Sequence, residues 1–201
     1  MNYVITGGAG HISKPLAETL IAAGHQVTII GRNAANLQEL VAKGAKAAIG
    51  SVEDVAFLSA TFKGADGLYL MIPPNYGTTD LKGAITQVGK NYAAALKASP
   101  VKHVVVLSSI GAHLPDGTGP ITGLHRTEQA LNELTDINIL YLRPAFFYYN
   151  LLGLVGLVKH AGIIGNNFSI PAGKFPIVDT NDIAAVAADC LLYTSPSPRD
   201  S

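Results

Sequence analysis

Short apolar runs alternate along the chain with longer segments in which apolar residues recur at helical spacing. After a first run at residues 2–5, Leu16, Ala17, Leu20 and Ile21 would share one face of a helix. A later run, residues 103–107, has three consecutive valines and is too apolar for a strand with one face in water. The pattern predicts six strands, each followed by a helix. The expected strands are residues 2–5, 27–30, 45–49, 66–72, 103–107 and 137–142.

Strands that are buried on both faces and joined by helices form parallel sheets. We therefore predict an α/β fold with a doubly wound parallel sheet of the Rossmann type. In such sheets the ligand crevice lies at the carboxyl ends of the strands. The length of 201 residues suits one domain with a sizeable core, which we place at residues 1–189.

A glycine-rich turn, Thr6-Gly-Gly-Ala-Gly-His-Ile12, joins the first strand to the first helix. Glycines let the backbone approach a pyrophosphate, and the N–H groups at the start of the helix can receive its charge. The usual third glycine is replaced by Ser13, which should loosen the helix–strand packing or place a hydroxyl near the phosphates. A glycine turn that binds nothing is the alternative.

The end of the second strand bears on the choice of cofactor. NAD-binding folds carry an acidic residue there, which binds the ribose hydroxyls. This chain has Gly31-Arg32-Asn33 instead, and a guanidinium at Arg32 could bind a 2′-phosphate. We expect NADP as the cofactor, with NAD as the alternative; a merely solvated arginine remains open. Asn33 can also cap the following helix.

Composition argues against several classes of partner. The chain has no net formal charge, so nothing favours nucleic acid or an acidic membrane surface. Its longest apolar stretch, residues 145–158, is interrupted by Asn150 and is too short to be a membrane-span candidate. No export signal precedes the first strand, so we expect a cytoplasmic protein that acts on a small molecule. We expect no metal site.

Residues 190–201 differ from the rest of the chain. Cys190 to Asp200 resembles the translation of a transposase sequencing adaptor in one reading frame, and it breaks the helical pattern that runs through Asp189. We therefore interpret residues 190–201 as a non-native read-through tail. The native protein would then continue beyond Asp189 with residues that are absent here. A native Ser/Pro-rich terminus is the alternative.

Several motifs together resemble the NmrA-like branch of the atypical short-chain dehydrogenase/reductases. They cover residues 1–189, and each is weak on its own. The glycine turn resembles the family's T-G-x-x-G-x-x-G loop. The other matching segments are Gly64-Ala-Asp66, Met71-Ile-Pro-Pro74, Val106-Leu-Ser-Ser-Ile-Gly-Ala112, His125-Arg-Thr-Glu-Gln-Ala-Leu131, Leu142-Arg-Pro-Ala-Phe-Phe-Tyr-Tyr-Asn150 and residues 179–188.

The resemblance implies an NAD(P)-binding oxidoreductase similar to the quinone-reductase-like members of the family. It places the cofactor at the glycine turn and at the strand ends. The expected cofactor-binding residues are Thr6, Gly7, Gly10, His11, Ile12, Arg32, Asn33, Met71, Ile72, Pro73, Ser108, Pro144, Ala145 and Phe146. A homodimer or a regulatory protein partner is also compatible with the resemblance.

The acid/base pair that short-chain reductases normally use is missing. None of the eight tyrosines is followed four positions later by a lysine. One interpretation is a reductase whose acceptor needs little proton transfer, such as a quinone or another small flat molecule. The other is a sensor that binds NADP and regulates a protein partner without turnover.

Under the reductase interpretation, Ser109 and His125 are the candidate catalytic residues. Ser109 follows the fifth strand, and His125 could donate a proton near neutral pH. A strand-end cap and a surface histidine are the alternatives. The aromatic run Phe146-Phe-Tyr-Tyr149 would either belong to the core or line the site for a flat, apolar substrate.

Overall fold

Six parallel strands form the main sheet, in the order β3-β2-β1-β4-β5-β6. The computed structural model describes residues 1–75, 77–164 and 175–193. The predicted doubly wound α/β fold is confirmed, and the strand order reverses between β1 and β4, where such folds bind ligands. The strands are β1 Asn2–Ile5, β2 Gln26–Gly31, β3 Lys46–Ile49, β4 Gly67–Leu70, β5 His103–Leu107 and β6 Asn138–Leu142.

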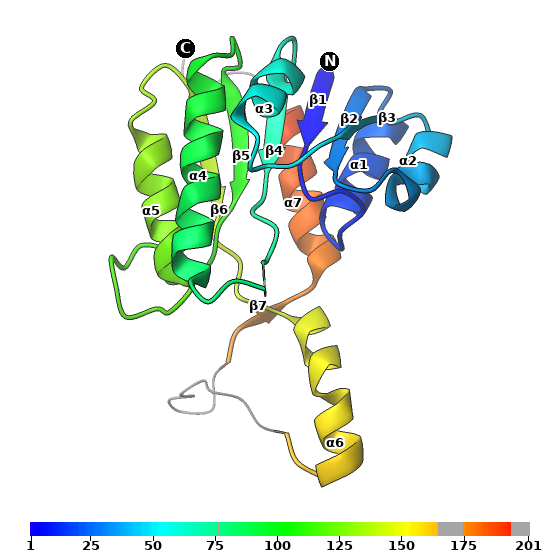
Figure 1. Cartoon of the computed structure of the whole chain (residues 1–201). Helices are drawn as coiled ribbons and strands as arrows, with labels where there is room; N and C mark the ends of the chain where they lie inside the picture. The colour runs from blue at the N-terminus through cyan, green and yellow to red at the C-terminus, as the bar shows by residue number, and fades with distance from the viewer. Residues whose placement is uncertain (76, 165–174, 194–201) are drawn as a thin grey trace.

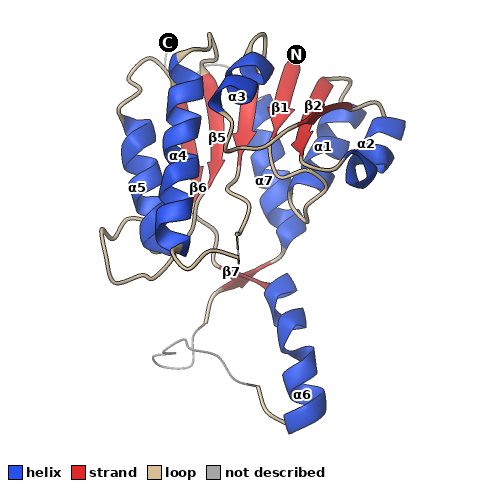
Figure 2. Ribbon diagram, in the orientation of Figure 1, coloured by secondary structure: helices blue, strands red, loops and turns tan. Residues whose placement is uncertain are grey.

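Helices cover both faces of this sheet (Figures 1 and 2). Helices α3, α4 and α5 lie on one face, and α1, α2 and α7 lie on the other. The α-helices are α1 Ser13–Ala22, α2 Gln38–Ala42, α3 Val55–Phe62, α4 Leu81–Lys97, α5 Ile121–Asn132, α6 Val155–Ala161 and α7 Thr180–Leu192. Two 3₁₀ helices, η1 Ala34–Leu37 and η2 Tyr148–Leu154, precede α2 and α6.

Successive residues of each central strand point into two different cores. Ile29 packs with Leu16 of α1 and Ala184 of α7, whereas Ile30 packs with Phe62 of α3 and Tyr92 of α4. Both isoleucines are almost completely buried. Burying each such side chain contributes about 1.5–3 kcal/mol. This two-sided burial explains why the strands appear in the sequence as unbroken apolar runs.

The last helix, α7, continues past the point where the sequence pattern was expected to break. It extends three residues beyond Asp189 to Leu192, and Leu191 is fully buried. The Tyr3 hydroxyl donates a hydrogen bond of 3.0 Å to the Leu191 carbonyl oxygen. The cause is a continuing apolar stripe, because Leu191 follows Ala187 by four residues. Residues 194–201 lie outside the described residues, so their non-native origin stays a prediction.

An apolar arm, defined here as residues 148–164, extends away from the body below the sheet (Figure 1). It consists of η2, α6 and the residues that follow α6. At its base, β7 (Phe146–Phe147) pairs in parallel with β8 (Ile177–Val178). Many of its apolar side chains are exposed, including Leu152 at 61% and Ile164 at 74%. None of the helices in the described residues is long and apolar enough to span a membrane.

Candidate functional site

A cleft of about 1680 Å³ opens at the carboxyl ends of β1, β2, β3 and β4. One wall is the glycine loop, defined as Gly7–Ile12, together with Ile30–Asn33 at the end of β2. Gly50–Glu53 after β3, the segment after β4 and part of α4 also line the cleft. Phe147, Tyr149 and Asn150, from β7 and the arm, and Thr180 of α7 complete the lining. The cleft therefore lies where the strand order reverses, as the doubly wound fold predicts.

Gly7 and Gly8 adopt backbone conformations that side chains rarely tolerate, with φ of +93° and +54°. Space is equally restrictive at Gly7. A Cβ atom there would lie 2.6 Å from Ser13 Oγ and 2.7 Å from Met71 Cγ. The loop backbone thus lies bare on the cleft wall, as close approach to a phosphate requires.

The start of α1 is open to an anion. Its N-cap residue Ile12 provides no side-chain capping bond, and its first turn contains no acidic residue. In the first turn of α1 the Lys14 amide already donates to the Gly10 carbonyl oxygen at 2.9 Å, and Pro15 has no N–H. The positive potential at this end therefore comes mainly from the helix dipole. The loop and the helix start therefore suit a pyrophosphate.

Ser13 occupies the position of the usual third glycine without disturbing this geometry. Its hydroxyl donates a hydrogen bond of 2.8 Å to the Thr6 carbonyl oxygen, and the residue is buried. The hydroxyl therefore links α1 to the end of β1. Ser13 also lines the cleft, so a hydroxyl near the phosphates stays a prediction, as does a looser packing of α1.

Thr6 is buried beneath the loop and does not line the cleft. Its Oγ1 accepts a hydrogen bond of 2.7 Å from the Met71 amide and lies 3.2 Å from the Met71 carbonyl oxygen. That carbonyl also accepts a bond of 2.6 Å from the Tyr92 hydroxyl. Thr6 thus joins the ends of β1 and β4, so its role in the structure is to hold the loop rather than to face a ligand.

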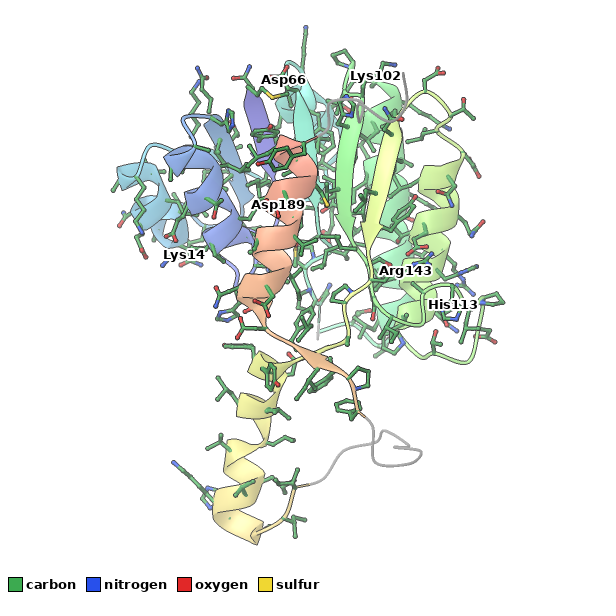
Figure 3. The ribbon with its side chains drawn as sticks, turned by 180° about the vertical axis from the view of Figure 1, so that it is seen from behind. Lys14, Asp66, Lys102, His113, Arg143 and Asp189 are labelled. Atoms are coloured by element: carbon green, nitrogen blue, oxygen red, sulfur yellow. The ribbon has the colours of Figure 1, made fainter. Side chains whose placement is uncertain are left out.

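Arg32 lies exposed on the cleft wall at the end of β2, and no carboxylate pairs with it among the described residues. Two carboxylates line the cleft, those of Glu39 and Glu53, and among the described residues only Glu39 is in an ion pair. Glu39 pairs with Lys14 at 2.6 Å and with Lys43 at 3.2 Å. Lys14 is at the start of α1, as Figure 3 shows. Asn33 accepts a hydrogen bond of 2.9 Å from the Ala35 amide, so it caps η1 as expected.

Two phenols near this cleft are deeply buried. Burial raises the pKa of Tyr69 and of Tyr92 well above the usual range, so both stay protonated at neutral pH. The Tyr69 hydroxyl is buried without a hydrogen-bond partner among the described residues. A catalytic tyrosine needs a lowered pKa, and neither environment provides it.

The residues proposed for catalysis lie outside the lining of the cleft. Ser109 Oγ donates a hydrogen bond of 3.0 Å to the Ile110 carbonyl oxygen. The Nδ1 atom of His125 lies 2.8 Å from the Ala112 carbonyl oxygen. Both side chains are half-buried, and the structure brings neither to the glycine loop.

A buried carboxylate organises the ends of β5 and β6. Glu128 of α5 is 3% exposed and accepts a hydrogen bond of 2.5 Å from the Ser108 hydroxyl. Its two oxygens also accept bonds from Nε and Nη2 of Arg143. Arg143 lies where β6 ends (Figure 3). Ser108 is therefore engaged in this network rather than in the cleft.

The cleft brings together nine of the sequence-predicted cofactor residues and omits five others. Those in the lining are Gly7, Gly10, His11, Ile12, Arg32, Asn33, Met71, Ile72 and Pro73. Those outside it are Thr6, Ser108, Pro144, Ala145 and Phe146. Of the aromatic run, Phe147 and Tyr149 line the cleft.

Sequence reasoning missed several lining residues. Gly50 and Ser51 follow β3 and could have been found by the strand-end rule that identified Arg32. Gln87 and Asn91 of α4 gave no such signal. Asn91 Nδ2 lies 3.2 Å from the Val52 carbonyl oxygen, and Gln87 donates to Asn91 Oδ1, so α4 holds the loop after β3.

These features define a dinucleotide-binding protein of the Rossmann class. The bare glycine loop, the open start of α1 and the unpaired Arg32 fit the phosphates of such a cofactor. Among the described residues, no cluster of potential metal ligands accompanies them.

Comparison with known proteins agrees with this class. Residues 7–192 match the family described as NAD(P)H-binding. The chain is 28% identical to an NAD(P)H azoreductase of Xenophilus azovorans, over 94% of this chain and 62% of that protein. It is also 28% identical to a (4-alkanoyl-5-oxo-2,5-dihydrofuran-3-yl)methyl phosphate reductase of Streptomyces griseus, over 98% of this chain and 65% of that protein.

A solved structure shares the fold. An NADPH-dependent quinone oxidoreductase of Escherichia coli, in complex with NADPH, superposes with a TM-score of 0.79 at 25% identity. The match covers 97% of this chain and 65% of that one. The chain belongs to the NAD(P)H-binding family, in the NmrA-like branch of the atypical short-chain dehydrogenase/reductases. It spans 62–65% of the length of these three relatives.

Proposed function

We propose that the protein is an NADPH-dependent oxidoreductase that transfers hydride to a small flat acceptor such as a quinone. Arg32 is the observation that supports NADPH over NADH. It lines the cleft without a carboxylate partner among the described residues, at the strand end where NAD-binding folds carry an acidic residue. Glu39, one of the two acidic residues that line the cleft, is paired with two lysines.

The protein's part in this reaction would be binding and orientation. The glycine loop and the start of α1 would hold the pyrophosphate, and Arg32 and Asn33 would hold the 2′-phosphate side. The bound cofactor would supply the hydride. Phe147 and Tyr149 line the cleft and would offer aromatic surface to a flat acceptor.

The names of relatives support this proposal. One is an azoreductase and another a quinone oxidoreductase. We also propose that the protein acts in the cytoplasm. A separate part of the proposal is that residues 190–201 are not native to the protein.

A second candidate function is an NADP sensor that acts through a protein partner. It is favoured by the positions of Ser109 and His125 outside the cleft lining, together with the two protonated phenols. A reductase without a proton-donating side chain can still act on an acceptor whose reduced form is stable. The lack of such a side chain therefore does not by itself decide between the two functions.

One experiment separates the two candidates. The protein is mixed with NADPH and a benzoquinone or naphthoquinone, and the 340 nm absorbance of NADPH is followed. Consumption above the protein-free rate supports the reductase. Tight NADPH binding without consumption rejects the reductase and leaves the sensor.

A further inference from the structure

The glycine loop and the arm meet at one pair of aromatic rings. The imidazole of His11 and the phenol ring of Tyr149 have centroids 3.6 Å apart, with 33° between their planes. His11 directly precedes Ile12, the N-cap residue of α1, and Tyr149 lies in the first turn of η2.

This stack is a feature of the cleft and not of the core. Both residues line the cleft and both are exposed. Its contribution to global stability should therefore be small, whereas its contribution to the shape of the cleft should be large. The two residues come from segments far apart in the sequence, and Phe147 at the base of the arm also packs against the core cluster that contains Ile12.

We propose that Tyr149 is a positioning residue for the dinucleotide and that it acts through His11. The glycines of the loop give its backbone many accessible conformations in the free protein. If the loop becomes ordered only when the cofactor binds, the lost conformational entropy weakens the affinity. The Tyr149 ring holds His11 beforehand. It thereby holds the N–H groups at the start of α1 in the conformation that receives a pyrophosphate.

This inference rests on the proposed binding of NADPH and adds a residue from outside the nucleotide-binding half of the fold. The sequence separates the two rings by most of the chain, so the loop motif itself contains no trace of the interaction. It also gives the base of the arm a role in cofactor affinity.

The test is a double-mutant cycle on NADPH affinity, measured by the increase in NADPH fluorescence on binding. Aromatic pairs contribute about 0.5–1.5 kcal/mol beyond their buried area, so Tyr149→Ala should raise the Kd about three- to tenfold. His11→Ala should raise it by a similar factor, and the double variant by no more than the larger single effect. Tyr149→Phe, which keeps the ring, should restore the wild-type Kd.

Tyr148→Ala is the matched control, because Tyr148 is the exposed neighbour of Tyr149 and does not line the cleft. Its Kd should equal that of the wild type. The melting temperatures of all these variants should stay close to the wild-type value, which excludes a general loss of structure as the cause.

Three results would overturn the inference. They are an unchanged Kd for Tyr149→Ala, multiplicative effects of the two alanines, and a Tyr149→Phe variant as weak as Tyr149→Ala. A wild-type protein that binds no NADPH would overturn the proposed function as well, so the two failures are distinguished by the wild-type titration.

Discussion

Two ends of the same sheet edge are built in opposite ways. At the nucleotide end, the glycine loop and the start of α1 offer backbone groups, and the side chains beneath them bond to the backbone. At the Glu128 end, where β5 and β6 finish, a buried carboxylate holds a serine and an arginine. The first end therefore presents backbone groups to a ligand, whereas at the second end the polar side chains of Ser108, Glu128 and Arg143 bond to one another.

The difference shows what each end requires of the chain. The nucleotide end depends on backbone conformation at a few adjacent positions, so a single substitution there should affect binding more than folding. The Glu128 end depends on side chains from three separate elements, so a single substitution there should affect folding more than binding.

The largest effect should come from Glu128→Ala, which removes the buried carboxylate. Removing one partner of a buried ion pair is strongly destabilising, and Arg143 is partly exposed, so we expect a loss of about 3 kcal/mol in the free energy of unfolding. Urea denaturation measures the loss. The Kd for NADPH of the folded variant should stay near the wild-type value.

Glu39→Ala is the control for that substitution. Glu39 also pairs with basic side chains, but in an exposed position, where such pairs contribute little. Equal stabilities of the Glu128 and Glu39 variants would contradict the structural role of the buried carboxylate.

Gly7→Ala should displace the glycine loop and weaken the binding of NADPH. The new Cβ would meet Ser13 and Met71, and the positive φ adds strain, so the loop backbone must move. Losing even one or two charge-assisted bonds to a phosphate should raise the Kd for NADPH about 100-fold. Isothermal titration calorimetry measures the change.

Gly64→Ala is a matched control for backbone strain. Gly64 also has a positive φ, of +85°, but a Cβ there would meet nothing within 4 Å, and the residue does not line the cleft. This variant should lose stability and keep its affinity. If both variants bind NADPH normally, the glycine loop is not the phosphate site.

Arg32→Ala tests cofactor choice at the same end. Loss of one charge-assisted contact should raise the Kd for NADPH about tenfold and leave that for NADH within about twofold. Arg126→Ala, an exposed arginine of α5 outside the cleft lining, is the control. Equal losses for NADPH and NADH would reject a 2′-phosphate contact.

The smallest effect should come from Tyr69 of β4, the strand that lies between β1 and β5. Tyr69→Phe removes a buried hydroxyl that has no partner among the described residues, so the free energy of unfolding should rise by about 1 kcal/mol. The melting temperature should then rise by about 2–4 °C.

Tyr92→Phe should do the opposite, because it removes the hydroxyl that donates to the Met71 carbonyl oxygen. Thermal unfolding followed by circular dichroism distinguishes the two variants. A Tyr69→Phe protein that melts below the wild type would show that its hydroxyl is bonded after all.

The sequence predicted the fold because local pattern and global topology agree. Runs such as Val104–Val106 require cover on both faces, and only parallel strands joined by helices supply it. It also brought Gly7, Gly10 and Arg32 to one cleft, since they occupy fixed offsets from strand ends, and their binding of a nucleotide stays a prediction.

The remainder depends on contacts between distant residues. Glu128 belongs to the motif at residues 125–131, in which the sequence pointed to His125 as a catalytic candidate. In the structure it is the Glu128 carboxylate that joins α5 to Ser108 and Arg143. The meeting of His11 with Tyr149 depends on where the arm leaves the sheet. The β7–β8 pair sets this position, and no local spacing encodes it.

Ser13 has a consequence for how this loop can vary. Its hydroxyl bonds to Thr6, and the same oxygen is the nearest obstacle to a side chain at Gly7. The two positions are therefore epistatic: a lineage that acquires serine at 13 raises the penalty for every later change at 7. Reversion to glycine at 13 would remove that one obstacle and leave Met71 and the backbone strain in place.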